Sequence, residues 1–134
     1  MTQHPEMWGA GVIGVPLLDM LRIEQIAAGA SWAGEYGQSS VPEERAFLAS
    51  ISPYHNLKAD VDYPEPFIYT TNKDDRVGPA HARKFAALME ELGKPFYFLE
   101  ILEGGHSNGA DIKQRASTSA TIFNYLTKKL MDHN

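Results

Sequence analysis

The sequence predicts an α/β fold built from parallel strands that are joined by crossover helices. Two apolar runs rich in β-forming residues, at 66–71 and 95–102, are separated by a stretch with helical periodicity. A second helical stretch follows the later run, and a strand–helix–strand–helix order is typical of parallel pairing with right-handed crossovers. A third apolar run, at 9–18, shows no alternation of polar and apolar residues, which predicts a strand covered on both faces.

The stretch between the first and second strands is expected to alternate between short helices and loops. The first strand ends in a loop at Pro16, and a short helix follows it. A segment rich in Gly and Ser indicates a loop, and Pro42 with two acidic residues behind it predicts the start of a helix. A long Pro-rich connection then leads to the second strand. The short helix spans 19–27, the loop rich in Gly and Ser spans 28–41, the helix that starts at Pro42 spans 42–50, and the Pro-rich connection spans 52–66.

The second half of the chain has clearer patterns. A helix is expected over 79–92, because apolar residues recur there at intervals of three and four and Gly93 can end it. The strand at 95–102 follows, and a last helix is expected over about 112–131. One face of that last helix is apolar and consists of Ala116, Ala120, Phe123, Leu126 and Leu130.

Composition excludes several classes of protein. A chain of 134 residues suits one domain with a real core, and a net charge of -5 without a basic run argues against nucleic-acid binding. No stretch reaches the roughly 18 apolar residues of a membrane span. The absence of cysteine excludes disulfides and thiolate chemistry, and no cofactor is expected. The first residues lack the features of a secretory signal, which favours the cytoplasm, although composition leaves the compartment open.

Asp74 and His106 each follow one of the two later β-like runs. If these runs are neighbouring parallel strands, both residues emerge at the carboxyl edge of the sheet, where open α/β sheets place their chemistry. Asp followed by His is the order of the second and third members of an α/β-hydrolase triad. Gly104 and Gly105 give the second loop the freedom to bring His106 over the sheet edge. The nucleophilic serine on a Gly-x-Ser-x-Gly turn is expected to be absent from the chain.

Spacing leaves other interpretations open. An acidic turn after a strand is often only a helix cap, and spacing does not decide whether Asp74 or Asp75 faces His106. A metal site built from these three residues lacks a clear further ligand, so no metal is expected. His55 is expected to hold the Pro-rich connection by hydrogen bonds. The remaining histidines are expected to be solvated, and they are His4, His81 and His133.

Five motifs in a fixed order carry a more specific signal. They are Val15–Met20, Trp32 to Gly37, Ser52–Asn56, Asp74–Val77 with Pro79, and Glu103–His106. Together they resemble the prolyl oligopeptidase family of serine peptidases, from Thr2 to about Leu130. The resemblance implies that 1–134 form the C-terminal portion of a catalytic domain, a partial α/β-hydrolase fold that holds the last three parallel strands.

The resemblance also implies a role for individual residues. Asp74 and His106 match the aspartate and histidine of the catalytic triad. Arg76 matches an arginine that binds the carbonyl of the residue before the substrate proline, and Trp32 matches a tryptophan that stacks on that proline. A flat ring is well held between an indole and apolar walls. Further lining of the same pocket is expected from Tyr36, Val77 and Leu17.

The matching family places its serine turn upstream of the segment that this chain matches. The expected partners are therefore short proline-containing peptides and the amino-terminal half of the hydrolase domain. Self-association through the edge of the strand at 9–15 is the other possibility, because that edge lacks a neighbour. Alone, the chain is expected to show no significant peptidase activity. The alternatives are a non-catalytic module that binds proline-containing peptides or serves in assembly, and a gene fragment.

Overall fold

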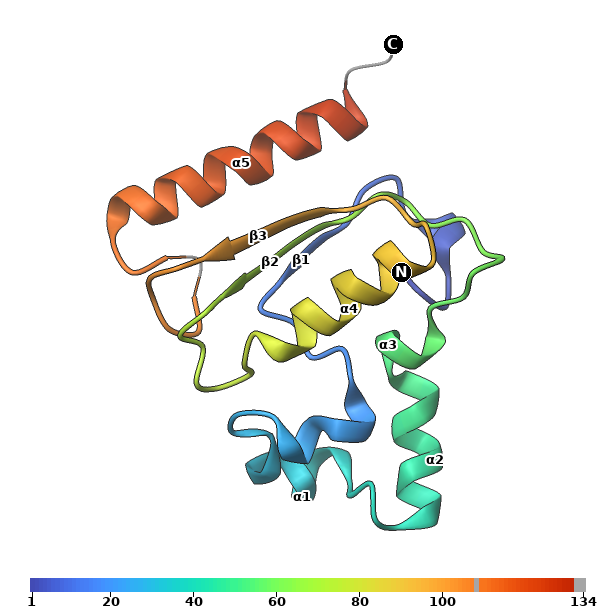
Figure 1. Cartoon of the computed structure of the whole chain (residues 1–134). Helices are drawn as coiled ribbons and strands as arrows, with labels where there is room; N and C mark the ends of the chain where they lie inside the picture. Colours follow the sequence, from blue (N-terminus) through green and yellow to red (C-terminus); the bar gives the residue numbers. More distant parts are fainter. Residues whose placement is uncertain (108, 132–134) are drawn as a thin grey trace.

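A computed structural model describes residues 1–107 and 109–131 and contains a three-stranded parallel sheet (Figure 1). Its strands are β1 (Val12–Gly14), β2 (Phe67–Thr71) and β3 (Tyr97–Ile101), in that spatial order. Phe67 of β2 lies opposite Val12 on one side and Tyr97 on the other, and Thr71 lies opposite Ile101. The predicted α/β class is confirmed, and β2 therefore occupies the centre of the sheet.

The first strand is shorter than the sequence predicts. Its ladder begins with the Phe67 amide donating to Gly11 O at 2.8 Å and ends with the Val15 amide donating to Tyr69 O at 2.9 Å. Val15 has a φ of +40°, a left-handed conformation that a β-branched residue seldom adopts. The chain therefore leaves the sheet at Val15, and residues 16–18 lie outside the strand.

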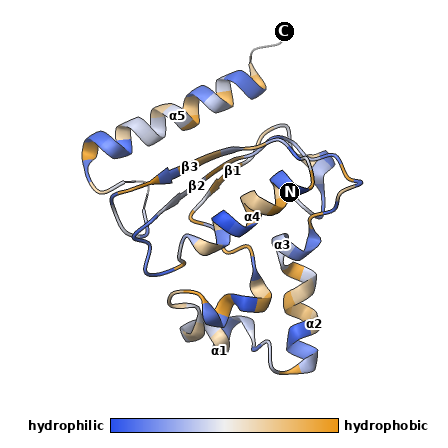
Figure 2. Ribbon diagram, in the orientation of Figure 1, coloured by the Kyte–Doolittle hydropathy of each residue, from blue (hydrophilic) through white to orange (hydrophobic). Residues whose placement is uncertain are grey.

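Two long helices cover opposite faces of the sheet (Figure 1). The helix α4 (Ala80–Glu91) connects β2 to β3 and confirms the prediction over 79–92, while α5 (Ile112–Leu130) follows β3. Figure 2 shows hydrophobic and hydrophilic residues mixed along both helices, as expected for helices with one buried face. The buried face of α4 packs on β2 in the main core, whose fully buried members are Ile68, Ala82, Phe85 and Met89.

The helix α5 rests on the sheet through a different face from its apolar stripe. Its buried residues are Thr118 and Tyr125. The Tyr125 hydroxyl donates to Glu65 O at 2.8 Å and accepts the Gly11 amide at 2.9 Å. In contrast, Phe123 is 68% exposed. The other exposed members of the stripe are Ala116, Ala120 and Leu130.

The segment between β1 and β2 forms a small helical lobe below the sheet in Figure 1. The predicted helix at 19–27 is a 3-10 helix, and the predicted loop at 28–41 contains two short helical turns, which corrects that prediction. The predicted connection at 52–66 starts with a one-turn helix. A second buried cluster of Met20, Ile23 and Leu48 packs here against Trp32. The elements of this lobe are η2 (Met20–Gln25), η3 (Gly29–Trp32), α1 (Ala33–Tyr36), α2 (Pro42–Ile51) and α3 (Pro53–Asn56), and η1 (Pro5–Met7) precedes the sheet.

The histidines divide into different environments. His4 is exposed, as expected, and His55 lies 2.8 Å from the Ser52 hydroxyl through Nδ1. The prediction that His81 is solvated is wrong, because its side chain is fully buried on α4 and accepts hydrogen bonds from backbone amides. His133 lies outside the described residues. None of the helices in the described ranges is long and apolar enough to cross a membrane.

Candidate active site

The loops after β2 and β3 start side by side at the carboxyl edge of the sheet. Thr71 and Ile101 are paired across the two strands, and the Asn72 amide donates to Ile101 O at 3.0 Å. The parallel register thus places the residues that follow each strand in the same region. This arrangement brings Asp74 and His106 together although they are 32 positions apart in the chain.

Asp74 is held in place by its own turn. One carboxylate oxygen, Oδ1, accepts the backbone amides of Arg76 and Val77, each at 3.0 Å. This local capping is typical of an aspartate that follows a strand. The second oxygen, Oδ2, remains directed at His106, and the side chain is fully buried. Of the two neighbouring acids, Asp74 is therefore the one that faces His106, whereas Asp75 is exposed.

The loop that carries His106 depends on glycine and on a contact with β2. Gly104 has a φ of +103°, and a Cβ there would lie 2.8 Å from the backbone nitrogen of Ala110. A side chain at this position would therefore be strained and would collide with the returning chain. Thr71, at the end of β2, donates its hydroxyl to Gly105 O at 2.7 Å. The buried threonine thus ties the histidine loop to the central strand.

The imidazole and the carboxylate form a directed pair. His106 Nδ1 lies 3.0 Å from Asp74 Oδ2. Because the carboxylate is an acceptor, Nδ1 donates, which leaves Nε2 free to accept a proton. Burial raises the pKa of Asp74, but the hydrogen bond from His106 and the Val77 and Arg76 amides together outweigh it and lower that pKa below its ordinary value. The pair thus has the geometry of a general base held by a carboxylate.

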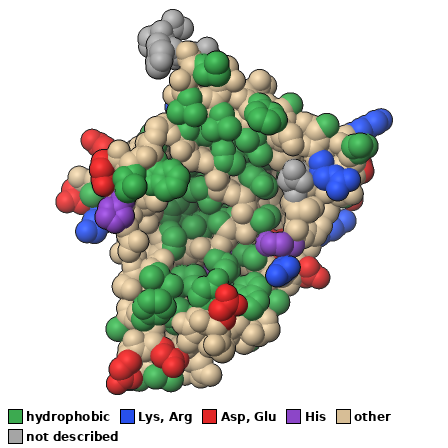
Figure 3. All heavy atoms as spheres, turned by 180° about the vertical axis from the view of Figure 1, so that it is seen from behind, with side chains coloured by type: hydrophobic (Ala, Val, Ile, Leu, Met, Phe, Trp, Pro, Cys, Tyr) green, Lys and Arg blue, Asp and Glu red, His purple; other side chains and the backbone are tan. Residues whose placement is uncertain are grey.

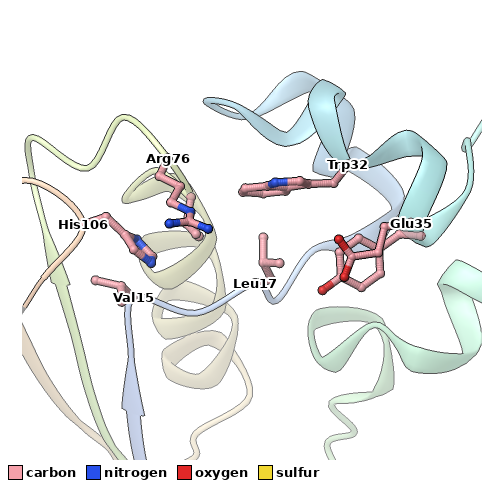
Figure 4. A pocket seen from close by; sticks show the side chains of 8 residues that line it. Val15, Leu17, Trp32, Glu35, Arg76 and His106 are labelled. Carbon is pink, nitrogen blue, oxygen red and sulfur yellow. The ribbon is translucent and has the colours of Figure 1, made fainter.

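A cavity of about 440 Å³ adjoins His106 (Figure 4). In Figure 4 the Trp32 indole and the Arg76 guanidinium extend from opposite sides toward the space beside Leu17. These side chains come from η3, from the turn after β2 and from the loop after β1. The structure therefore brings together all five residues expected to bind substrate. The complete lining is Val15, Leu17, Trp32, Glu35, Tyr36, Arg76, Val77 and His106.

Sequence reasoning missed Val15 and Glu35 among the pocket residues. Val15 directly follows β1 at the same carboxyl edge as Asp74, which is a signal that strand ends alone could have given. Glu35 lies three positions after Trp32 and next to Tyr36, and residues at this spacing share a helical face. Within the described residues no cluster of His, Asp and Glu could hold a metal ion.

One expectation about the sequence needs correction. Gly105-His106-Ser107-Asn108-Gly109 matches the letters Gly-x-Ser-x-Gly, so the pattern is present in the chain. This segment follows β3 and contains the histidine itself, whereas a nucleophile elbow precedes the aspartate in the order Ser, Asp, His. The Ser107 hydroxyl donates to Gly109 O at 3.0 Å. That bond directs its proton into its own turn.

Comparisons with known proteins match nearly the whole chain to one family. The sequence profile described as the prolyl oligopeptidase family matches residues 1–133. The uncharacterized peptidase y4nA of Sinorhizobium fredii is 56% identical over 133 residues, which are 99% of this chain and 18% of that protein. A prolyl endopeptidase of Elizabethkingia meningoseptica is 34% identical over 129 residues, or 93% of this chain and 18% of that protein.

Solved structures agree with this assignment. A post-proline cleaving enzyme from Rickettsia typhi superposes with a TM-score of 0.93 at 34% identity, over 97% of this chain and 19% of that one. A structure from a study of two prolyl endopeptidases gives a TM-score of 0.86 at 41% identity, over 97% and 20% of the two chains. The chain thus spans about a fifth of the length of these relatives. Its three parallel strands and helices match the C-terminal part of an α/β-hydrolase catalytic domain, and the chain belongs to the prolyl oligopeptidase family.

Proposed function

We propose that this chain supplies the aspartate, the histidine and the proline pocket of a serine-type peptidase that cleaves after proline. The observation that carries the proposal is that His106 is hydrogen-bonded to Asp74 and lines the same cavity as Trp32. A proton-transfer group is thus placed beside a pocket with an aromatic wall. This combination suits chemistry at a peptide bond next to a flat apolar ring.

In the proposed reaction each residue has a defined task. His106 takes the proton of a serine hydroxyl at Nε2 while the serine attacks the carbonyl of the proline, and it then gives the proton to the leaving amine. Water, deprotonated by the same nitrogen, then hydrolyses the acyl-serine ester and releases the peptide that ends in proline. Asp74 fixes the ring orientation and stabilises the imidazolium that forms. Trp32 packs on the proline ring, and Arg76 donates to the carbonyl of the preceding residue. The serine comes from outside the 134 residues of this chain.

The pocket is expected to bind a peptide that ends in proline even without the serine. A suitable probe is acetyl-Ala-Pro, which resembles the product of post-proline cleavage. Trp32→Ala is expected to weaken its binding about 30-fold, because aromatic anchors in a pocket contribute about 2 kcal/mol or more. The dissociation constant is measured by NMR titration of the 134-residue chain.

The chain offers a matched control for this experiment. Phe47→Ala removes another aromatic side chain, which is 55% exposed on α2 and does not line the pocket. Binding should be unchanged in Phe47→Ala. Equal weakening by both substitutions, or no binding to the unsubstituted chain, contradicts the proposed proline pocket.

We further propose that the edge of β1 receives another strand. No strand of the described residues pairs with its outer edge, and Val12 is 37% exposed there. An apolar groove of about 270 Å³ adjoins this strand and includes Trp8, Val12 and Ile13. Figure 3 shows hydrophobic side chains gathered around a hollow on the face opposite to that of Figure 1. The rest of a longer catalytic domain, or a second copy of this chain, would cover such a surface.

The isolated chain is accordingly expected to self-associate. Sedimentation velocity at increasing concentration should show a dimer or larger species. Val12→Lys, which places a charge on the exposed strand edge, should shift the population toward monomer. Ala87→Lys, at an exposed residue of α4, makes the same change in net charge and serves as the control. A monomer at high concentration that melts cooperatively contradicts the proposed edge.

A further inference from the structure

The loop that leaves β1 carries two residues of the pocket and has a strained start. Val15, with its φ of +40°, and Leu17 both line the cavity. A branched residue keeps such a conformation only where the surrounding structure holds it. Residues 15–20 are therefore expected to be held in place by groups from other elements.

Two fully buried side chains bind the backbone of this loop. His81 Nδ1 accepts the amide of Asp19 at 3.1 Å and the amide of Leu18 at 3.4 Å. Ser52 donates its hydroxyl to Leu18 O at 3.0 Å and accepts the Met20 amide at 3.1 Å. The polar backbone groups directly behind Leu17 are thus satisfied by residues that come from α4 and from the start of α3.

The two amides determine the chemical state of His81. A nitrogen that accepts two N–H groups carries no proton, so the neutral ring holds its proton on Nε2. Within residues 1–107 and 109–131, Nε2 is buried and has no hydrogen-bond partner. Burial lowers the pKa of His81 and outweighs the opposing effect of nearby Asp19. Protonation would turn the acceptor into a donor that faces two donors.

His81 lies on the helix that directly follows the other wall of the pocket. Its helix, α4, starts at Ala80, three residues after Val77, and the turn before it carries Arg76 and Asp74. The side chain of His81 therefore links this turn and its helix to the loop that carries Val15 and Leu17. On the backbone of the loop this contact is made by the imidazole, and beside it Lys84 of α4 pairs with the Asp19 carboxylate.

We propose that His81 is a positioning residue whose Nδ1, as an acceptor of the Leu18 and Asp19 amides, holds the β1 loop against α4 and so sets the shape of the pocket. The proposal rests on the proposed function only for the identity of the ligand that fills the pocket. The contact itself can be tested without any ligand.

The test compares two substitutions at this position. His81→Asn keeps an acceptor oxygen close to the place of Nδ1, whereas His81→Leu removes the acceptor and keeps an apolar side chain. Amide hydrogen exchange of the 134-residue chain reports the opening of the loop. In His81→Leu the Leu18 and Asp19 amides should exchange about tenfold faster or more, relative to the Ile68 and Phe85 amides, because buried donors lose their acceptor. His81→Asn should restore most of their protection.

A control on the same helix distinguishes a local opening of the loop from a general loss of stability. Met89→Ala removes a fully buried side chain of α4 that does not bind the loop. It should speed exchange at core and loop amides alike. The proposal is overturned if His81→Leu behaves like Met89→Ala, or if His81→Asn exposes the loop as much as His81→Leu does.

Two further readouts keep the test decisive. If His81→Leu does not fold, nitrogen NMR of the unsubstituted chain decides: a neutral ring protonated on Nε2 supports the proposal, and an imidazolium or an Nδ1 proton overturns it. Binding of acetyl-Ala-Pro should weaken in His81→Leu and recover in His81→Asn. If the unsubstituted chain does not bind this peptide, the proposed function fails while the exchange result still tests His81.

Discussion

The purified 134-residue chain is expected to release no chromophore from a proline-linked chromogenic peptide above the uncatalysed rate. Removal of the serine from a Ser-His-Asp triad lowers turnover by about 10⁶. If the serine lies elsewhere, as proposed, the backbone donor that follows the nucleophile in an α/β-hydrolase lies elsewhere as well. A bound peptide would then meet a positioned histidine without an attacking oxygen.

Two substitutions make this expectation decisive. Turnover that is abolished by His106→Ala would show that the chain is catalytic by itself. Turnover abolished by Ser107→Ala would assign the nucleophile to the Gly-x-Ser-x-Gly segment at 105–109, against the proposal that the serine lies elsewhere. Binding of acetyl-Ala-Pro without turnover, with neither substitution having an effect on the rate, is the expected result. The same result is what a binding module without catalysis would give, so a second experiment is needed.

The second experiment supplies the serine from a relative. A chimaera in which this chain replaces the matching segment of the Elizabethkingia meningoseptica prolyl endopeptidase is expected to cleave after proline. In that chimaera His106→Ala should lower kcat by about 10⁶, as removal of a triad histidine does elsewhere. Asp74→Asn should lower kcat by about 10⁴, because the imidazole is then held in the wrong tautomer.

The chain supplies a matched control for the Asp74→Asn substitution. Asp75→Asn makes the same chemical change one position away, at an exposed side chain. Activity of the chimaera should change little in this variant. An equal loss in Asp74→Asn and Asp75→Asn, or full activity in His106→Ala, would remove both residues from the proposed mechanism and favour a module that only binds.

The sequence predicted the elements whose patterns are local. The strands expected at 66–71 and 95–102 appear as Phe67–Thr71 and Tyr97–Ile101, and α4 agrees with its apolar spacing. Parallel pairing predicted that the acidic turn after the strand at 66–71 lies near His106, and the family resemblance chose Asp74 over Asp75. The pocket residues did not follow from any pattern. They lie on four separate segments, and only the resemblance to a family joined them.

What the sequence could not predict depends on distant contacts. His81 is polar and lies at the start of a helix, so it was expected in solvent. It is buried because its ring satisfies amides that are 62 and 63 positions away. The apolar stripe of α5 suggested the face that packs on the sheet, yet Tyr125 is buried instead. Its hydroxyl bonds to Gly11 and Glu65, and no local rule indicates those partners.

The most direct measurement of the central claim is the tautomer of His106 at neutral pH, observed by nitrogen NMR of the 134-residue chain. The account predicts a proton on Nδ1 and a free Nε2, with this state retained in Asp75→Asn and lost in Asp74→Asn. A neutral ring protonated on Nε2, or a ring that does not respond to Asp74→Asn, would contradict it.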